Sequence, residues 1–177
     1  FADKQILEAQ VLWAGKVAKA LKDHKAMWAY DLGNENSNCW VPKRREDGLG
    51  WLKQVTEEIK SADPIHPITI GMNMEDLEED RKIGPAEAAQ FCDFLCMHGY
   101  PIYAKWIKDP TNERLLPFLG LITHWLGKKD VLFEEFGGPS VSDNYKNDTG
   151  YVLYTESEGA QYTERALKAL HEFGFMG

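Results

Sequence analysis

The hydrophobic positions of the chain alternate between short continuous runs and longer stretches with helical spacing. Continuous apolar runs that end in turn residues are typical of buried strands, and a spacing near 3.6 residues is typical of helices packed against them. Four runs predict strands at residues 26–33, 66–72, 93–98 and 131–136. Helical spacing predicts helices at residues 3–24, 49–59, 85–91, 115–126 and 160–173.

Polar segments separate these elements. Long loops are predicted at residues 36–48, 99–112 and 137–158. Residues 75–82 are acidic and are expected to form a solvated loop or a loose helix. Phe175 and Met176 are expected to begin a further strand.

The regular alternation of strand and helix predicts a parallel α/β sheet with right-handed crossovers. The strands are apolar on both faces, as strands covered by helices must be. No glycine-rich phosphate loop follows the first strand, and this disfavours a dinucleotide-binding fold.

Composition narrows the possible partners. Hydrophobic residues make up 44% of the 177 positions, which is enough for one sizeable core. The formal net charge of -8 argues against nucleic acid, because phosphate binding is usually carried by a basic surface. No apolar run approaches the roughly 20 residues that cross a membrane, so no membrane partner is expected.

The three cysteines, Cys39, Cys92 and Cys96, are not accompanied by a histidine pair at metal-ligand spacing. We therefore expect buried free thiols and no metal site. The chain begins at Phe1 without an initiator methionine or a signal-like segment. The expectation is that a segment was removed or that the chain is part of a longer protein.

Polar, reactive residues stand where three of the four predicted strands end. They are Asn34 and Glu35, then His98 and Tyr100, then the pair at positions 134 and 135. Glu35 and Glu135 are 100 residues apart, or about three units of a barrel with roughly 31 residues per unit. Strands three units apart lie nearly across such a barrel, so two carboxylates at their carboxyl ends converge on one pocket. Glycoside hydrolysis requires a pair of this kind.

Three motifs carry a specific resemblance: Asp31-Leu32-Gly33-Asn34-Glu35, His98-Gly99-Tyr100-Pro101 and Phe133-Glu134-Glu135-Phe136-Gly137. The chain resembles clan A glycoside hydrolases, and is most similar to glycoside hydrolase family 5, the cellulase and β-mannanase group. The resemblance implies an α/β fold: a (β/α)8 TIM barrel present only in part, from about strand 4 to strand 7 with the start of strand 8. Residues 1–177 would form a single partial barrel catalytic domain.

The resemblance implies catalytic roles for two glutamates. Glu35 would be the general acid/base and Glu135 the nucleophile. We choose Glu135 over Glu134 because the family places the nucleophile directly before the aromatic residue of Glu-Phe-Gly. Alternation along a strand is also expected to leave only one of the pair facing the pocket.

Substrate-binding roles follow from the same resemblance. Asn34 would bind the sugar 2-hydroxyl, Tyr100 would hold the nucleophile by a hydrogen bond, and His98 would line the same wall. Trp40, Tyr103 and Trp106 lie on loops that would surround the site, where flat aromatic faces suit sugar stacking. Core packing is expected for the remaining tryptophans, Trp13, Trp28, Trp51 and Trp125.

The leading hypothesis is a retaining glycoside hydrolase that cleaves β-linked glycosides, such as mannan or glucan polysaccharide, with no cofactor. Its partner would be an oligosaccharide or polysaccharide, and the resemblance suggests a secreted or periplasmic protein. The alternative is a non-catalytic carbohydrate-binding or interaction protein on a truncated barrel. Because closure needs eight strands, residues 1–177 alone are expected to be inactive.

Overall fold

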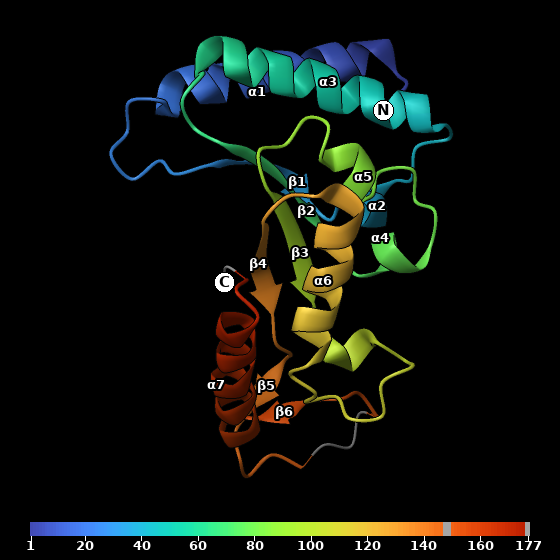
Figure 1. Ribbon diagram of the computed structural model, residues 1–177, viewed down its shortest axis with the longest axis vertical. Coiled ribbons are helices and arrows are strands. Elements are labelled where there is room, and N and C mark those ends of the chain that lie inside the picture. Colours follow the sequence, from blue (N-terminus) through green and yellow to red (C-terminus); the bar gives the residue numbers. More distant parts are fainter. Residues whose placement is uncertain (147–149, 176–177) are drawn as a thin grey trace.

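The computed structural model describes residues 1–146 and 150–175. Its centre is a parallel sheet with the order β1-β2-β3-β4 (Figure 1). The strands are β1 (Tyr30–Asn34), β2 (Ile68–Met72), β3 (Leu95–Gly99) and β4 (Val131–Phe136). Each strand is joined to the next through helical segments, so the predicted strand–helix alternation and parallel sheet are confirmed.

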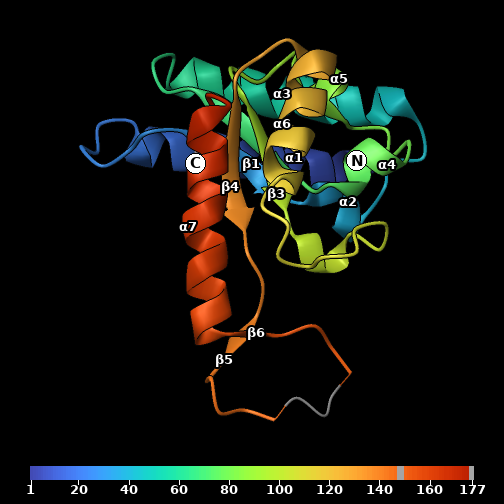
Figure 2. The ribbon, with the colours of Figure 1, turned by 60° about the horizontal axis from the view of Figure 1, so that its bottom comes forward.

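The helices are α1 (Lys4–Leu21), α2 (Asn36–Cys39), α3 (Arg45–Ala62), α4 (Glu75–Glu78), α5 (Pro85–Ala88), the 3-10 turn η1 (Pro101–Tyr103), α6 (Leu115–Gly127) and α7 (Glu156–Glu172). α1 and α3 lie side by side across one end of the structure, α6 lies along β3, and α7 lies beyond β4 (Figures 1 and 2). Two short strands, β5 (Ser140–Val141) and β6 (Tyr154–Thr155), pair with each other past the carboxyl end of β4.

Capping residues explain where two of the helices begin. The Asp3 side chain accepts a hydrogen bond from the Ile6 amide at 3.0 Å and caps α1. Thr155 and Glu158 form a reciprocal capping box that starts α7. This start lies inside the loop predicted for residues 137–158, which also contains β5 and β6, so that loop was predicted too long.

The second long helix also begins earlier than hydrophobic spacing indicates. α3 starts at Arg45 rather than near residue 49. Its first turn contains Glu46 and Asp47, whose charges interact favourably with the positive end of the helix dipole. These residues are polar, so hydrophobic periodicity alone does not detect this turn.

The first strand is shorter than its apolar run. Pairing begins at Tyr30, where the Tyr30 amide donates to the Pro67 carbonyl at 2.9 Å, and residues 26–29 precede the ladder. At the other end of the chain, Phe175 is not in a strand, and Met176 lies outside the described residues.

The two faces of the sheet have different surroundings. Along β3, Leu95, Met97 and Gly99 belong to the helix-covered side, where a side-chain carbon on Gly99 would meet Leu116 of α6. Because side chains alternate along a strand, Cys96 and His98 point to the opposite, concave face. The candidate chemistry lies on that concave face.

Trp51 packs in the core as predicted, but the prediction is wrong for Trp13, Trp28 and Trp125, which are exposed. Trp28 precedes the strand ladder and lies against Phe94, and Trp125 lies beside the Lys128 ammonium. Trp13 borders a groove next to β1, a strand that pairs only with β2 among the described strands.

The cysteines follow the prediction at two of three positions. Cys92 and Cys96 are buried free thiols, whereas Cys39, at the end of a surface helix, is exposed. Within residues 1–146 and 150–175, none of the helices combines the length and the apolar character needed to cross a membrane.

Candidate active site

Glu35 is fixed by its backbone at the point where β1 ends. Its amide donates to the Gly71 carbonyl of β2 at 2.9 Å, and its own carbonyl accepts from the Asn38 amide in α2. Its φ of 44° lies in the left-handed region, which is uncommon for a residue with a side chain. Strained conformations of this kind cost about 1–3 kcal/mol and cluster at functional sites.

His98 of β3 contacts Glu35 directly. Its Nδ1 lies 2.9 Å from Glu35 Oε1 and 3.6 Å from Glu135 Oε2. One oxygen of each glutamate and the His98 nitrogen all lie within 4.8 Å of one another. The fold therefore brings together three predicted site residues from three different strand ends.

A bulge in β4 changes the expected alternation. Met97 pairs with Phe133 but His98 pairs with Glu135, so Glu134 is one extra residue on β4. Glu134 Oε2 lies 3.8 Å from His98 Nε2, while Glu135 lies near Nδ1 of the same ring. The bulge brings both glutamates near the His98 ring, but of the pair only Glu135 lines the cavity at the strand ends, in agreement with the expectation that one of the two faces the pocket.

Tyr100 and Glu135 form a short hydrogen bond inside the site. The Tyr100 hydroxyl donates to Glu135 Oε2 at 2.6 Å. Both line a cavity of about 280 Å³ together with Glu35 and His98. The other lining residues are Asn38, Asn73, Met74, Glu75 and Tyr103.

Three predicted substrate-binding residues are outside this lining. Asn34 is exposed at the end of β1, and Trp40 is exposed at the end of α2. The Trp106 indole donates to Glu78 at 2.8 Å, and its ring lies 6.0 Å from that of Phe118. These contacts do not bring Trp106 into the cavity, so sugar binding by Asn34, Trp40 and Trp106 remains a prediction.

Sequence reasoning missed a polar chain that supports Glu35. The Asn38 amide group donates to Glu35 Oε2 at 2.7 Å. Arg81 in turn donates to Asn38 at 2.8 Å and pairs with Glu75 at 2.5 Å. Asn38 follows Glu35 by three residues in a helical turn, a spacing that brings side chains together. The contribution of Arg81 depends on a loop 43 positions away.

Burial and the neighbouring charges shift the pKa values of several side chains in and beside the site. Burial alone would lower the pKa of His98, but its contacts with Glu134 and Glu35 outweigh burial and raise it. The pKa of Glu134 is lowered, chiefly by His98. Desolvation and the charge of Glu134 raise the pKa of Asp31. Desolvation and the Glu135 carboxylate raise the pKa of Tyr100, which keeps its hydroxyl protonated as a donor.

Two overlapping sets of side chains have the atoms of a metal site. In Glu35, His98 and Glu135, and in Cys96, His98 and Glu134, the potential ligand atoms lie within 4.8 Å of one another. His98 belongs to both sets. Its two ring nitrogens face different carboxylates, since Nδ1 is near Glu35 and Nε2 is on the side of Glu134.

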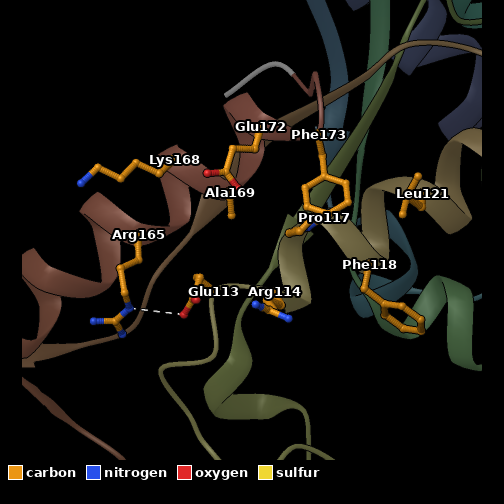
Figure 3. Close-up of a pocket in the computed structure, with 10 residues that line it drawn as sticks. All are labelled: Glu113, Arg114, Pro117, Phe118, Leu121, Arg165, Lys168, Ala169, Glu172 and Phe173. Atoms are coloured by element: carbon orange, nitrogen blue, oxygen red, sulfur yellow. Dashed lines mark hydrogen bonds and ion pairs between the residues drawn. The ribbon is translucent and has the colours of Figure 1, made fainter.

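A larger cavity, of about 540 Å³, lies between α6 and α7. Figure 3 shows apolar side chains such as Pro117 and Phe173 on its walls, and Arg165 directed towards Glu113 at its margin. The ion pair between Arg165 and Glu113 measures 3.3 Å. None of the residues predicted for chemistry lines this cavity, so the smaller cavity at the strand ends is the candidate active site.

Neither the protein-family models nor the curated proteins give a match to the sequence. Solved structures do match. An exo-β-1,4-mannosidase from an Opitutaceae bacterium is 24% identical with a TM-score of 0.76, covering 100% of this chain and 33% of its own. A GH5_18 protein from Streptomyces cattleya in complex with GlcNAc is 14% identical with a TM-score of 0.78, and the match covers 96% of this chain and 42% of that protein. A β-glucuronidase from an uncultured Clostridium is 23% identical with a TM-score of 0.70, and the match covers 96% of this chain and 28% of that protein.

The chain therefore spans less than half the length of each of these structural neighbours. The neighbours are TIM-barrel glycoside hydrolases, and the matched part is a partial barrel. The resemblance to clan A glycoside hydrolases is confirmed at the level of the fold, and the chain has the fold of part of their (β/α)8 barrel.

Proposed function

We propose that this chain carries the catalytic centre of a retaining glycoside hydrolase. The observation that carries the proposal is the cluster of Glu35, His98 and Glu135, whose facing atoms lie within 4.8 Å of one another. Retaining enzymes hold their two carboxyl groups about 5–5.5 Å apart, whereas inverting enzymes leave about 6.5–9.5 Å for a water molecule. The short separation favours a direct nucleophile.

In the proposed first step, a Glu135 oxygen attacks the anomeric carbon, and the bond from that carbon to the leaving oxygen breaks. Glu35 gives its proton to the leaving oxygen. In the second step, Glu35 takes a proton from water, the water oxygen attacks the same carbon, and the ester bond to Glu135 breaks. Two inversions leave the sugar with its original configuration.

The neighbouring side chains have supporting roles in this scheme. Tyr100 holds one Glu135 oxygen by its 2.6 Å hydrogen bond and leaves the other free to attack. His98 lies between the two glutamates and donates or accepts according to which of its ring nitrogens carries the proton. Asn34, Trp40 and Trp106 are proposed to bind sugar units as the substrate enters.

The proposed substrate class is a β-linked mannoside or glucoside. The exo-β-1,4-mannosidase and the GH5_18 protein, which was also solved with Manβ1-4GlcNAc, support a β-mannoside. The β-glucuronidases among the structural neighbours share the fold but act on a different sugar, so substrate range must be measured.

The experiment is to incubate the full-length protein containing this chain with aryl β-mannosides and β-glucosides and to follow the anomeric configuration of the first product by NMR. Retention of configuration is expected, and Glu35→Gln and Glu135→Gln should each abolish turnover. An inverted product would contradict the assignment of Glu135 as nucleophile.

A second candidate is a carbohydrate-binding protein without turnover. It is favoured by the open sheet: β1 and β4 are edge strands among the described residues, and a closed barrel needs eight strands. Residues 1–177 expressed alone should therefore bind mannan oligosaccharides but hydrolyse them at least about a hundredfold more slowly than the full-length protein, because small displacements of catalytic groups cost that much. Binding without hydrolysis by both proteins would favour the second candidate.

A further inference from the structure

The concave face of the sheet holds a second polar cluster one layer below the proposed catalytic centre. Cys96 and His98 point to it from β3, and Glu134 points to it from the bulge of β4. The Cys96 sulfur, a His98 ring nitrogen and a Glu134 oxygen all lie within 4.8 Å of one another. The proposed hydrolase mechanism uses neither Cys96 nor Glu134.

His98 provides an independent sign that a ligand belongs there. The residue is only 1% exposed, and its Nε2 is a buried nitrogen without a hydrogen-bond partner. The nearest acidic oxygen, from Glu134, is 3.8 Å away, which is beyond hydrogen-bonding distance. An unpaired buried nitrogen costs free energy, so such a group is normally satisfied by a partner.

The space beside this nitrogen is left open by a glycine. A side-chain carbon on Gly71 would lie 3.0 Å from His98 Nε2 and 3.5 Å from Asp31 Oδ2. Asp31 therefore faces the same space from β1. Three strands, β1, β3 and β4, contribute one sulfur, one nitrogen and two carboxylates around a position on β2 where no side chain stands.

We propose that Cys96, His98 and Glu134 form a binding site for zinc or a similar divalent cation, with Asp31 beside it. Zinc prefers sulfur, imidazole nitrogen and carboxylate oxygen in tetrahedral sets, and this cluster offers all three donor types. On binding, the Cys96 S–H bond breaks, a sulfur–metal bond forms, and the proton leaves to solvent. The charges of one thiolate and one carboxylate then balance the divalent cation.

The site shares His98 with the proposed catalytic centre. A cation on Nε2 leaves the ring proton on Nδ1, where it faces Glu35 at 2.9 Å. Metal binding would thereby fix the ring as a hydrogen-bond donor to the acid/base glutamate. The metal site does not depend on the proposed hydrolase activity, because its test measures binding alone.

The test is cobalt titration of the full-length metal-free protein. Co²⁺ bound by a thiolate gives a sulfur-to-metal charge-transfer band in the near ultraviolet, and Zn²⁺ should remove the band by competition. Cys96→Ser should abolish the band, and Cys92→Ser should retain it. Cys92 is a matched control because it is also a buried free thiol but is not in the cluster.

A second variant keeps the test decisive if Cys96→Ser fails to fold. Glu134 is partly exposed, and Glu134→Gln keeps its shape, so this variant should fold and weaken cobalt binding at least about tenfold. A charge-transfer band that persists in Cys96→Ser would overturn the site. The absence of stoichiometric cobalt binding would also overturn the site. If Glu35→Gln abolished cobalt binding and Glu134→Gln left it unchanged, the cation would lie at Glu35, His98 and Glu135 instead, and the proposed site would again be wrong.

Discussion

His98 Nδ1 lies 2.9 Å from Glu35 Oε1, although the two residues are 63 positions apart in the chain. The contact joins the carboxyl ends of β3 and β1, which are separated in the sheet by β2. Gly71 of β2 makes it possible, because any side chain there would approach the His98 ring. Active sites of TIM-barrel enzymes are built at this end of the strands.

Tyr100→Phe should lower turnover by about tenfold to a hundredfold. The variant removes the hydroxyl that donates to Glu135, and a hydrogen bond to a charged group contributes about 1.5–3 kcal/mol. Steady-state kinetics of the full-length protein on an aryl β-mannoside measures the loss. Tyr103→Phe is the matched control, because Tyr103 lines the same cavity but is not a donor to Glu135 in the described contacts. Equal losses in both variants would contradict the role of Tyr100.

Asn38→Ala should lower turnover most on substrates with poor leaving groups. Asn38 links Glu35 to Arg81, and its loss frees the glutamate that protonates the leaving oxygen. A misplaced acid costs up to about a hundredfold, whereas an activated leaving group needs little protonation. Rates on aryl glycosides of graded leaving-group ability separate the two cases. Cys39→Ala, at the next position of α2, should behave as wild type, and an equal loss on all substrates would argue against a positioning role for Asn38.

Gly99→Ala should destabilise the protein by about 1–3 kcal/mol. The new methyl carbon would overlap with Leu116 Cδ2, so β3 and α6 must move apart or Leu116 must change rotamer. Gly50→Ala is the control: no atom lies within 4 Å of its new carbon, and alanine favours the α3 helix by up to about 1 kcal/mol. Urea unfolding midpoints should therefore shift in opposite directions. A stable Gly99→Ala variant would mean that α6 is not packed closely on β3.

Asp63 should make the free energy of unfolding depend on pH in the acid range. Burial alone would raise its pKa, but hydrogen bonds from Tyr30, His66 and two backbone amides outweigh burial and lower the pKa below its ordinary value. A lowered pKa in the folded state stabilises the protein above the unfolded-state pKa near 4, and this stabilisation is lost as the pH falls towards the folded-state pKa.

Asp63→Asn should thus reduce stability at neutral pH and flatten the decline between about pH 5 and pH 2. Unfolding midpoints across this range measure the slope, with Asp23→Asn at an exposed turn as control. An unchanged acid slope in Asp63→Asn would contradict the assignment.

Much of the fold follows from local patterns, whereas the site depends on contacts between strands. Apolar runs located all four sheet strands, and the residues at their ends included Glu35, His98, Tyr100 and Glu135. The β4 bulge was not predictable, because it arises from pairing with β3 and has no signature in Glu134 or its neighbours.

Two further features needed the tertiary structure. Trp13 has the helical spacing of a core residue, yet the described structure leaves it exposed beside the open edge of β1. Cys96 and His98 lie two positions apart on β3 and therefore share one face of the sheet. The third member of the cluster, Glu134, comes from the next strand and reaches them only through the bulge. The sequence expectation of no metal site rested on spacing within single segments.

Trapping the covalent intermediate is the most direct test of the proposal that Glu135 is the nucleophile. The full-length protein is incubated with a fluorinated, slowly hydrolysed β-glycoside that carries an activated leaving group, and the labelled residue is found by peptide mass spectrometry. One sugar ester per chain is expected on Glu135, and the Glu134→Gln substitution should leave the labelling unaffected. A label on Glu134, or full turnover by Glu135→Gln, would contradict the proposal.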